Sequence, residues 1–294
     1  MNIATLNTQY GIDKKVSFKA YQHTIVAEIT SVHSTTRVSL YGGQVLSFIP
    51  NGEKDLLFMS SASTFQEGKA IRGGIPVCWP WFGAHPVDHS LPSHGFARIS
   101  TWTVLNTQEA GDDVVLTLGL SANAETLKLW PYHFEAELEV RAGKTLSVSL
   151  KTRNTDTKAF EISAALHSYF NISNIEAIQL EGLCNCNYLD DVNNSEGKQQ
   201  EERLSITGRI DRRYRNTTAN CHIHDNNRII KVGKKGSQIT VVWNPGAELT
   251  KQMADLGDLD YRNMLCVEAA NSLEDTISVL PGQQHILNTT IGQQ

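Results

Sequence analysis

The chain has 294 residues, of which 40% are hydrophobic and 19% are charged. That balance excludes an intrinsically disordered chain and leaves enough apolar side chains for a sizeable buried core. The formal net charge of -5 excludes the basic surface that general nucleic-acid binding needs. We therefore expect a globular protein with no nucleic-acid partner.

Targeting segments and the pattern of cysteines indicate the cellular compartment. No stretch reaches the roughly 18 consecutive apolar residues of a membrane-spanning helix. The first residues carry no basic segment followed by an apolar run, so we expect no signal peptide and no membrane partner. The five cysteines are odd in number and irregularly spaced, which is typical of reduced thiols. These features predict a cytoplasmic protein, with a monomer as the default state.

Alternation of apolar and polar residues with a period of two recurs along the chain and predicts β-strands. In chain order the predicted strands are 25–29, 38–49, 114–120, 134–141, 146–151, 160–166, 177–183, 229–232, 239–243, 277–280 and 285–291. Helical periodicity is confined to 122–129 and 248–256. Many strands with few short helices favour one large sandwich or barrel, so we expect a single all-β domain over residues 1–294.

The segment 71–83, IRGGIPVCWPWFG, does not alternate. Its adjacent glycines allow close backbone approach, and its two prolines exclude a central strand. One interpretation is a pocket wall that combines the cation of Arg72 with aromatic faces such as that of Trp81, a usual way to hold a sugar. The alternative is a packed loop that covers one end of the sandwich.

Three further segments place titratable residues beside apolar ones. On an extended segment His94 and Arg98, four residues apart, would project to the same side and could hold an anion or a polyol. His167 ends the apolar run 162–166, where it can be aimed into a cleft. Glu268 interrupts an apolar stretch, and a buried carboxylate is costly unless it is paired. For each histidine the alternative is a structural hydrogen bond.

Two other clusters are candidates of a weaker kind. The first offers zinc ligands, but its C-x-C and H-x-H spacings also follow from alternation on strands, so we expect no metal site. It consists of Cys184, Cys186, Cys221, His222 and His224. The second is the basic run 209–215, which could bind phosphate or nucleic acid. Because it contains Asp211 and belongs to an acidic chain, we favour a solvated face for Arg212, Arg213 and Arg215.

Several segments, taken in order, resemble the aldose 1-epimerase (mutarotase) superfamily, and within it the hexose-6-phosphate mutarotases. The matching segments are IRGGIPVCWPWFG at 71–83, HGFAR at 94–98, LHSYF at 166–170, IDRRY at 210–214, VWNP at 242–245, KQMAD at 251–255 and CVEAA at 266–270. The resemblance implies an all-β, galactose-mutarotase-like β-supersandwich with few short helices. It also implies an isomerase that interconverts the α and β anomers of a hexose 6-phosphate without a metal or an organic cofactor.

The resemblance implies residue roles as well. His167 matches the general acid at the ring oxygen, and Glu268 matches the general base at the anomeric hydroxyl. We expect these two to face each other across a bound pyranose. The residues expected to bind the substrate are Arg72, His94, Arg98, Asp211 and Trp81, of which Arg72 and Arg98 match the phosphate contact.

Two other functions stay open at this point. One is an aldose 1-epimerase that acts on unphosphorylated sugars, and the other is a non-catalytic carbohydrate-binding domain on the same scaffold. A binding domain would need neither His167 nor Glu268, so their presence favours the enzyme.

Overall fold

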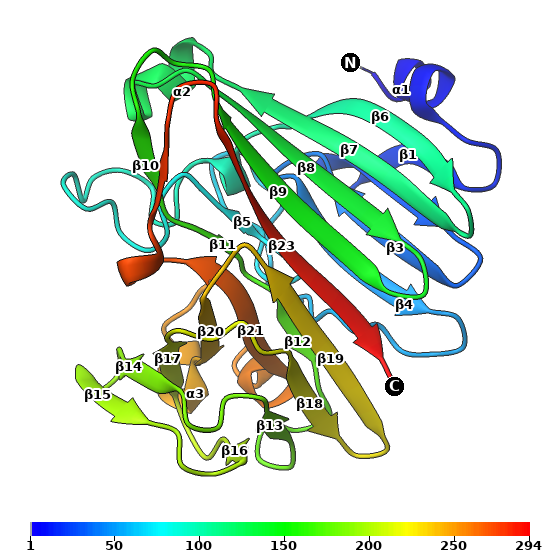
Figure 1. Cartoon of the computed structure of the whole chain (residues 1–294). Helices are drawn as coiled ribbons and strands as arrows, with labels where there is room; N and C mark the ends of the chain where they lie inside the picture. Colours follow the sequence, from blue (N-terminus) through cyan, green and yellow to red (C-terminus); the bar gives the residue numbers. More distant parts are fainter. Residues whose placement is uncertain (1) are drawn as a thin grey trace.

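The structure is a computed structural model that describes residues 2–294, and β-strands make up most of its regular structure (Figure 1). The first strands are β1 (Val16–Tyr21), β2 (Thr24–Thr30), β3 (Ser34–Ser39), β4 (Gln44–Pro50), β5 (Val77–Cys78), β6 (Thr103–Ala110), β7 (Asp113–Ser121), β8 (Phe134–Ala142) and β9 (Leu146–Asn154). Short strands follow: β10 (Phe160–Ile162), β11 (Ala164–Leu166), β12 (Tyr169–Asn171), β13 (Gln179–Glu181), β14 (Asn187–Asp190), β15 (Ser195–Lys198) and β16 (Arg203–Ser205). The last are β17 (Ile210–Tyr214), β18 (Cys221–Asp225), β19 (Arg228–Lys235), β20 (Ile239–Asn244), β21 (Met264–Asn271), β22 (Ile277–Val279) and β23 (Gln284–Gln293).

Helices are short and few in the described part of the chain. The α-helices are α1 (Ile3–Tyr10), α2 (Ala124–Leu129) and α3 (Gly246–Thr250), and single 3₁₀ turns are η1 (Ala97–Ile99), η2 (Asp260–Asn263) and η3 (Leu273–Asp275). None of these helices has the length and apolar composition that crossing a bilayer requires. The predicted all-β class with few short helices is confirmed.

The strands form two large sheets and two small ones. The largest has nine strands in the order β16-β13-β18-β19-β23-β9-β8-β7-β6, and its long strands run side by side in Figure 1. The second has eight strands in the order β15-β14-β17-β20-β21-β11-β5, with β12 also paired to β21. The smaller sheets are β1-β2-β3-β4 and β10-β22. The C-terminal strand β23 lies between β19 and β9, so the end of the chain completes the middle of the largest sheet.

The predicted hairpin at 134–151 shows why these residues form strands. In β8, Phe134, Ala136, Leu138 and Val140 are buried while the residues between them are partly or fully exposed. The partner β9 repeats this alternation. One face of the sheet thus joins the core, where each fully buried large apolar side chain contributes about 1.5–3 kcal/mol.

An aromatic cluster fills the core next to the candidate site. Trp79 is fully buried, and its ring contacts those of Phe134, Trp130 and Phe96 at centroid distances of 4.6, 5.3 and 5.6 Å. These edge-on contacts hold the segment that carries Arg72 against the large sheet.

Some elements differ from their predictions. The predicted strand 38–49 is two strands, because Gly42 and Gly43 turn the chain with φ angles of 78° and 57°. The helix predicted at 248–256 is only α3, followed by turns. The sequence pattern also missed α1, where Asn2 caps the helix by accepting a hydrogen bond from the Thr5 amide.

Candidate active site

His167 and Glu268 are brought together by the register of two strands. Both β11 and β12 pair antiparallel with β21: Leu166 lies opposite Ala269, and Tyr169 lies opposite Cys266. The same register carried through the two intervening residues places His167 opposite Glu268. Cross-strand partners of this kind share one face of a sheet. The pair is therefore a product of strand pairing and does not depend on a flexible loop.

The two side chains are in contact. His167 Nδ1 lies 3.2 Å from Glu268 Oε1, and the side chains are 10% and 1% exposed. The contact lacks hydrogen-bond geometry, and among the described residues neither His167 Nδ1 nor Glu268 Oε2 has a hydrogen-bond partner. The expectation that a pyranose separates them is wrong, because the groups lie side by side with no room for a sugar between Nδ1 and Oε1.

The neighbouring strands extend the site across the sheet. Val241 of β20 lies opposite both Glu268 and Arg213 of β17. Two residues along, Trp243 lies opposite both Cys266 and Asp211. A cavity of about 450 Å³ opens over this face. It is lined by Arg72, Phe82, Gly83, Ala84, His94, His167, Asp191, Asp211, Arg213, Val241, Trp243 and Glu268.

His94 enters the cavity from the loop after the segment 71–83. Its amide donates to Gly83 O at 2.6 Å, and its Nδ1 accepts a hydrogen bond from the Gly83 amide at 3.3 Å. Its ring lies 5.9 Å from that of His167 and 5.0 Å from that of Phe82. Because Nδ1 is an acceptor, the neutral ring carries its proton on Nε2, which leaves Nε2–H as a donor.

Arg72 is fixed by two partners at the edge of the cavity. Its Nε and Nη2 lie 3.1 and 3.0 Å from Asp255 Oδ2, and its Nη1 donates to the Tyr169 hydroxyl at 2.8 Å. The Tyr169 ring is stacked on the imidazole of His167, with centroids 4.8 Å apart and planes within 8°. The guanidinium is thus linked to the His167 ring through one tyrosine.

Burial sets the charge states in the cavity. It raises the pKa of Glu268 well above the usual range, and the nearby Asp211 raises it further. Burial lowers the pKa of His167 well below its usual value, and the neighbouring His94 ring and the positive charges of Arg72 and Arg98 lower it further. The site therefore favours a protonated carboxyl and a neutral imidazole. This neutral pair binds as many protons as the carboxylate–imidazolium pair, so the two forms differ only in where one proton sits.

Two binding candidates have shifted pKa values of opposite sign. Burial raises the pKa of Asp211 from 3.8 to about 6, and the charge of Asp191 adds to the effect. Burial lowers the pKa of His94 to about 3, helped by the charges of Arg98 and Arg72. Near neutral pH Asp211 is therefore ionised and accepts hydrogen bonds, while His94 is uncharged.

Comparison with known proteins identifies the family. A family model described as aldose 1-epimerase matches residues 26–292. The chain belongs to the aldose 1-epimerase family. Proteins called "Putative glucose-6-phosphate 1-epimerase" from Escherichia coli (strain K12) and Cenchrus ciliaris are 38% and 37% identical, over 80% and 84% of this chain and 79% and 78% of theirs. A crystal structure described as a "putative mutarotase (YeaD)" from Salmonella typhimurium superposes with a TM-score of 0.89 at 32% identity, covering 95% of this chain and 94% of that one. The galactose-mutarotase-like sandwich is thereby confirmed.

Two of the expected substrate-binding residues, Trp81 and Arg98, do not line the cavity. Trp81 is 4% exposed, its Nε1 donates to Pro92 O, and its ring packs on Phe96. The prediction that it stacks on a sugar is wrong, because its ring is enclosed in the core. Arg98 donates from Nη2 to Ser93 O, and its buried Nε has no partner among the described residues.

The predicted extended segment that joins His94 to Arg98 is also wrong. His94 has a φ angle of 61°, and Arg98 lies in the 3₁₀ turn η1. The two side chains therefore do not share the face of a strand. The charge of Arg98 still reaches the site, since it lowers the pKa values of His94 and His167.

Sequence reasoning missed several residues of the aldose 1-epimerase cavity. Arg213 lines it and is paired with Asp191, with Nε–Oδ2 and Nη2–Oδ1 distances of 2.7 and 2.5 Å, so the solvated face expected there is wrong. Arg212, one residue earlier, points to the other face, over the ring of Tyr188. Strand alternation through Asp211 would have found Arg213, because residues two apart share a face. Asp191 lies outside the matched segments, and Asp255 ends the segment KQMAD, which does not by itself show that it pairs with Arg72.

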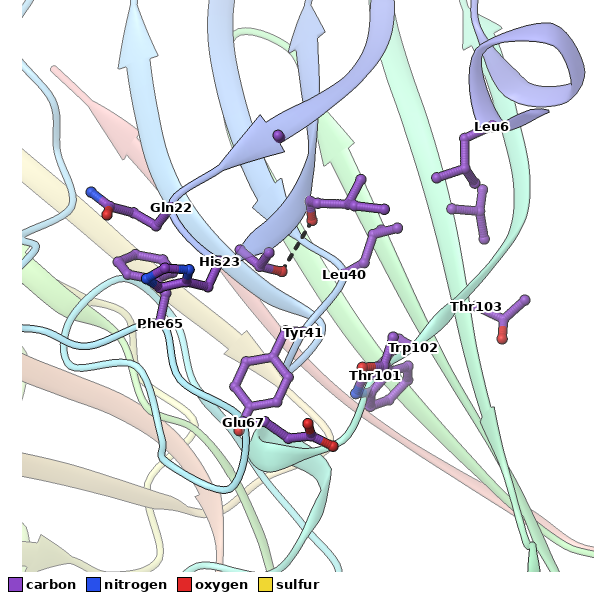
Figure 2. Close-up of a pocket in the computed structure, with 14 residues that line it drawn as sticks. Leu6, Gln22, His23, Leu40, Tyr41, Phe65, Glu67, Thr101, Trp102 and Thr103 are labelled. Carbon is purple, nitrogen blue, oxygen red and sulfur yellow. Dashed lines mark hydrogen bonds between the residues drawn. The ribbon is translucent and has the colours of Figure 1, made fainter. Parts of the chain in front are cut away.

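A larger cavity lies away from this site, beside the turn between β1 and β2 (Figure 2). It measures about 740 Å³, and Tyr41, Phe65 and Trp102 lie around it. Its imidazole and carboxylate, His23 and Glu67, are exposed to solvent. They lack the burial that tunes the His167–Glu268 pair, so the smaller cavity is the better candidate for the family's chemistry.

Proposed function

We propose that the chain interconverts the α and β anomers of a hexose 6-phosphate by acid–base opening and re-closure of the pyranose ring. The contact between His167 and Glu268 in the cavity carries this proposal. Ring opening takes one proton from the hydroxyl O1 and gives one to the ring oxygen O5, and both oxygens are bonded to C1. A donor and an acceptor that lie side by side suit such a geminal pair of atoms.

Each step balances within the pair. The Glu268 carboxylate removes the O1 proton while the His167 imidazolium protonates O5, and the C1–O5 bond breaks to give the open aldehyde. The pair is then a carboxylic acid and a neutral imidazole, which is the form that burial favours. Rotation about C1–C2 presents the other face of the aldehyde, and the reverse transfers close the ring as the other anomer. Each positioned group contributes roughly 10²–10⁴-fold to such a rate.

Other residues of the cavity suit the binding of a pyranose. Trp243 and Phe82 present aromatic rings, on which the C–H faces of a sugar stack. The ionised carboxylate of Asp211 and the free Nε2–H of His94 supply an acceptor and a donor for hydroxyls. These contacts fix the ring while its C1 end is held at the His167–Glu268 pair.

A phosphate group is the feature that separates this substrate from a free aldose. The relatives named above carry the name "Putative glucose-6-phosphate 1-epimerase", and the cavity contains two guanidinium groups, those of Arg72 and Arg213. A planar guanidinium binds phosphate through charge-assisted hydrogen bonds. Arg72 keeps N–H groups beyond those used by Asp255 and Tyr169, so we assign it the phosphate contact.

An exchange measurement tests the proposal directly. Two-dimensional NMR exchange between the α and β anomeric protons is measured with glucose 6-phosphate and with glucose, with and without the protein. We expect acceleration for both, with a larger kcat/KM for the phosphate. Equal acceleration would assign the chain to the unphosphorylated alternative, and no acceleration of either would support a binding domain.

We further infer that the protein is a cytoplasmic monomer that uses no cofactor. All five cysteines are free, which suits a reducing compartment. Every group of the acid–base scheme comes from this one chain. Light scattering that gave twice the 32.6 kDa chain mass would overturn the monomer.

A further inference from the structure

A third side chain lies against the acid–base pair and has no part in the proposed reaction. Cys266 occupies the same face of β21 as Glu268, two residues away, and lies opposite Tyr169. One ligand atom from each of His167, Cys266 and Glu268 lies within 4.8 Å of the others. All three residues are at least nine-tenths buried.

Two polar atoms of this cluster have no hydrogen-bond partner among the described residues. His167 Nδ1 and Glu268 Oε2 are buried without hydrogen-bond partners. Buried polar atoms normally have hydrogen-bond partners, and a buried polar atom without one destabilises the fold. A bound cation would satisfy both atoms and the thiolate together.

The donor set selects the class of ion. One imidazole nitrogen, one thiolate and one carboxylate oxygen suit borderline-soft divalent ions such as Zn²⁺, while Mg²⁺ and Ca²⁺ prefer oxygen ligands alone. Bond lengths of about 2.0–2.3 Å imply ligand–ligand edges of roughly 3.3–3.7 Å in a tetrahedron. The 3.2 Å between His167 Nδ1 and Glu268 Oε1, the second oxygen of the same carboxyl group, is close to such an edge. The two anionic ligands would also neutralise the charge of the ion.

We propose that His167, Cys266 and Glu268 form a binding site for one Zn²⁺-class ion, and that the ion inhibits the enzyme. The inhibition rests on the proposed function, because the ion occupies the two groups that move protons. The ion enters through the cavity that His167 and Glu268 line, and Cys266, which is not among the lining residues, supplies the third ligand. Metal and sugar therefore exclude each other.

Cobalt(II) reports the site without any activity measurement. The full chain is titrated with Co²⁺ and then with Zn²⁺, and we expect one equivalent to give a thiolate-to-cobalt charge-transfer band in the near ultraviolet, which Zn²⁺ removes. Cys266→Ala should lose the band, and so should Cys266→Ser, which keeps the volume if the alanine variant does not fold. Cys78→Ala is the matched control, because Cys78 is another buried thiol on the same sheet but not a member of the cluster.

Activity supplies the second measurement. Zn²⁺ should inhibit anomer exchange by competition with the sugar phosphate, and EDTA should restore the rate. Loss of one ligand in Cys266→Ala should weaken the inhibition roughly 10–100-fold while the metal-free rate stays near that of the wild type. A cobalt band that survives in Cys266→Ala and vanishes in a variant of the exposed Cys184 would overturn the site. If the cobalt band depends on Cys266 but the protein shows no anomer exchange, the metal site stands and the proposed function is rejected.

Discussion

The ring of Tyr169 lies parallel to the imidazole of His167, with centroids 4.8 Å apart, and its hydroxyl accepts a hydrogen bond from Arg72. One tyrosine thus touches both the proposed acid and the proposed phosphate ligand. Its ring and its hydroxyl have different tasks, which two substitutions separate.

Tyr169→Leu removes the ring that holds the His167 imidazole in place. We expect kcat to fall roughly 10–100-fold, because small misplacements of a reacting group are costly. Tyr169→Phe keeps the ring and loses only the hydroxyl, so KM for the sugar phosphate should rise with little change in kcat. Anomer-exchange kinetics of both variants check this, with circular dichroism as the control for folding. Equal losses of kcat would contradict separate tasks.

The proton-transfer pair makes the sharpest prediction. Glu268→Gln and His167→Asn each keep the approximate shape of the side chain and remove its ability to exchange a proton. We expect each to lower kcat roughly 10²–10⁴-fold for hexose 6-phosphate, with a smaller effect on KM. A wild-type kcat in Glu268→Gln would show that this carboxylate is not the base.

Phosphate selectivity should depend on Arg72. We expect Arg72→Ala to lower kcat/KM for glucose 6-phosphate about 10-fold or more, as the loss of a charge-assisted hydrogen bond implies, and to change activity on glucose less. Arg212→Ala is the matched control, because that guanidinium points to the other face of its sheet. Arg98→Ala should have a smaller effect, since Arg98 lies outside the cavity lining. Equal losses on both sugars would reject a phosphate role for Arg72.

Asp211 should make the protein less stable as the pH rises. Its pKa is about 6 in the folded protein and near 3.8 when exposed, so between pH 4 and 6 the folded state binds more protons than the unfolded state. Stability is therefore lost across this window as the pH increases. Asp211 is partly exposed, so we discount the full shift and expect Asp211→Asn to gain about 1–2 kcal/mol at pH 7.5 and little at pH 4. Urea unfolding at the two pH values measures the difference, and a gain of equal size at both would be the contrary result.

A substitution of Trp81 tests whether this residue stabilises the core or stacks on the sugar. Because its ring is enclosed in the core and donates to Pro92 O, Trp81→Phe should lower the free energy of unfolding by roughly 1–3 kcal/mol. KM for the sugar should stay within about twofold of the wild-type value, since a twofold change is only about 0.4 kcal/mol. A large rise in KM with unchanged stability would restore the stacking role.

The sequence predicted features that repeat locally and missed those that depend on distant pairing. Alternation in β8 and β9 correctly identified their buried faces, and local motifs pointed to His167 and Glu268. The ion pair between Arg72 and Asp255 joins residues 183 positions apart, so no local pattern contains it. Alternation cannot show which side of a non-strand segment faces a cavity, so the sequence does not distinguish Trp81, which packs in the core, from its neighbour Phe82, which lines the site.

The strand register sets His167 opposite Glu268. The number of residues in β21 is therefore a stricter constraint on the site than the identity of the residues around it. Conservative replacements along β21 would leave the carboxyl where it is, whereas inserting one residue between Cys266 and Glu268 would turn it toward the opposite side of the sheet. Engineers who wish to redesign the cavity therefore have freedom in the choice of side chains and in the loops, and almost none in the number of residues within this strand.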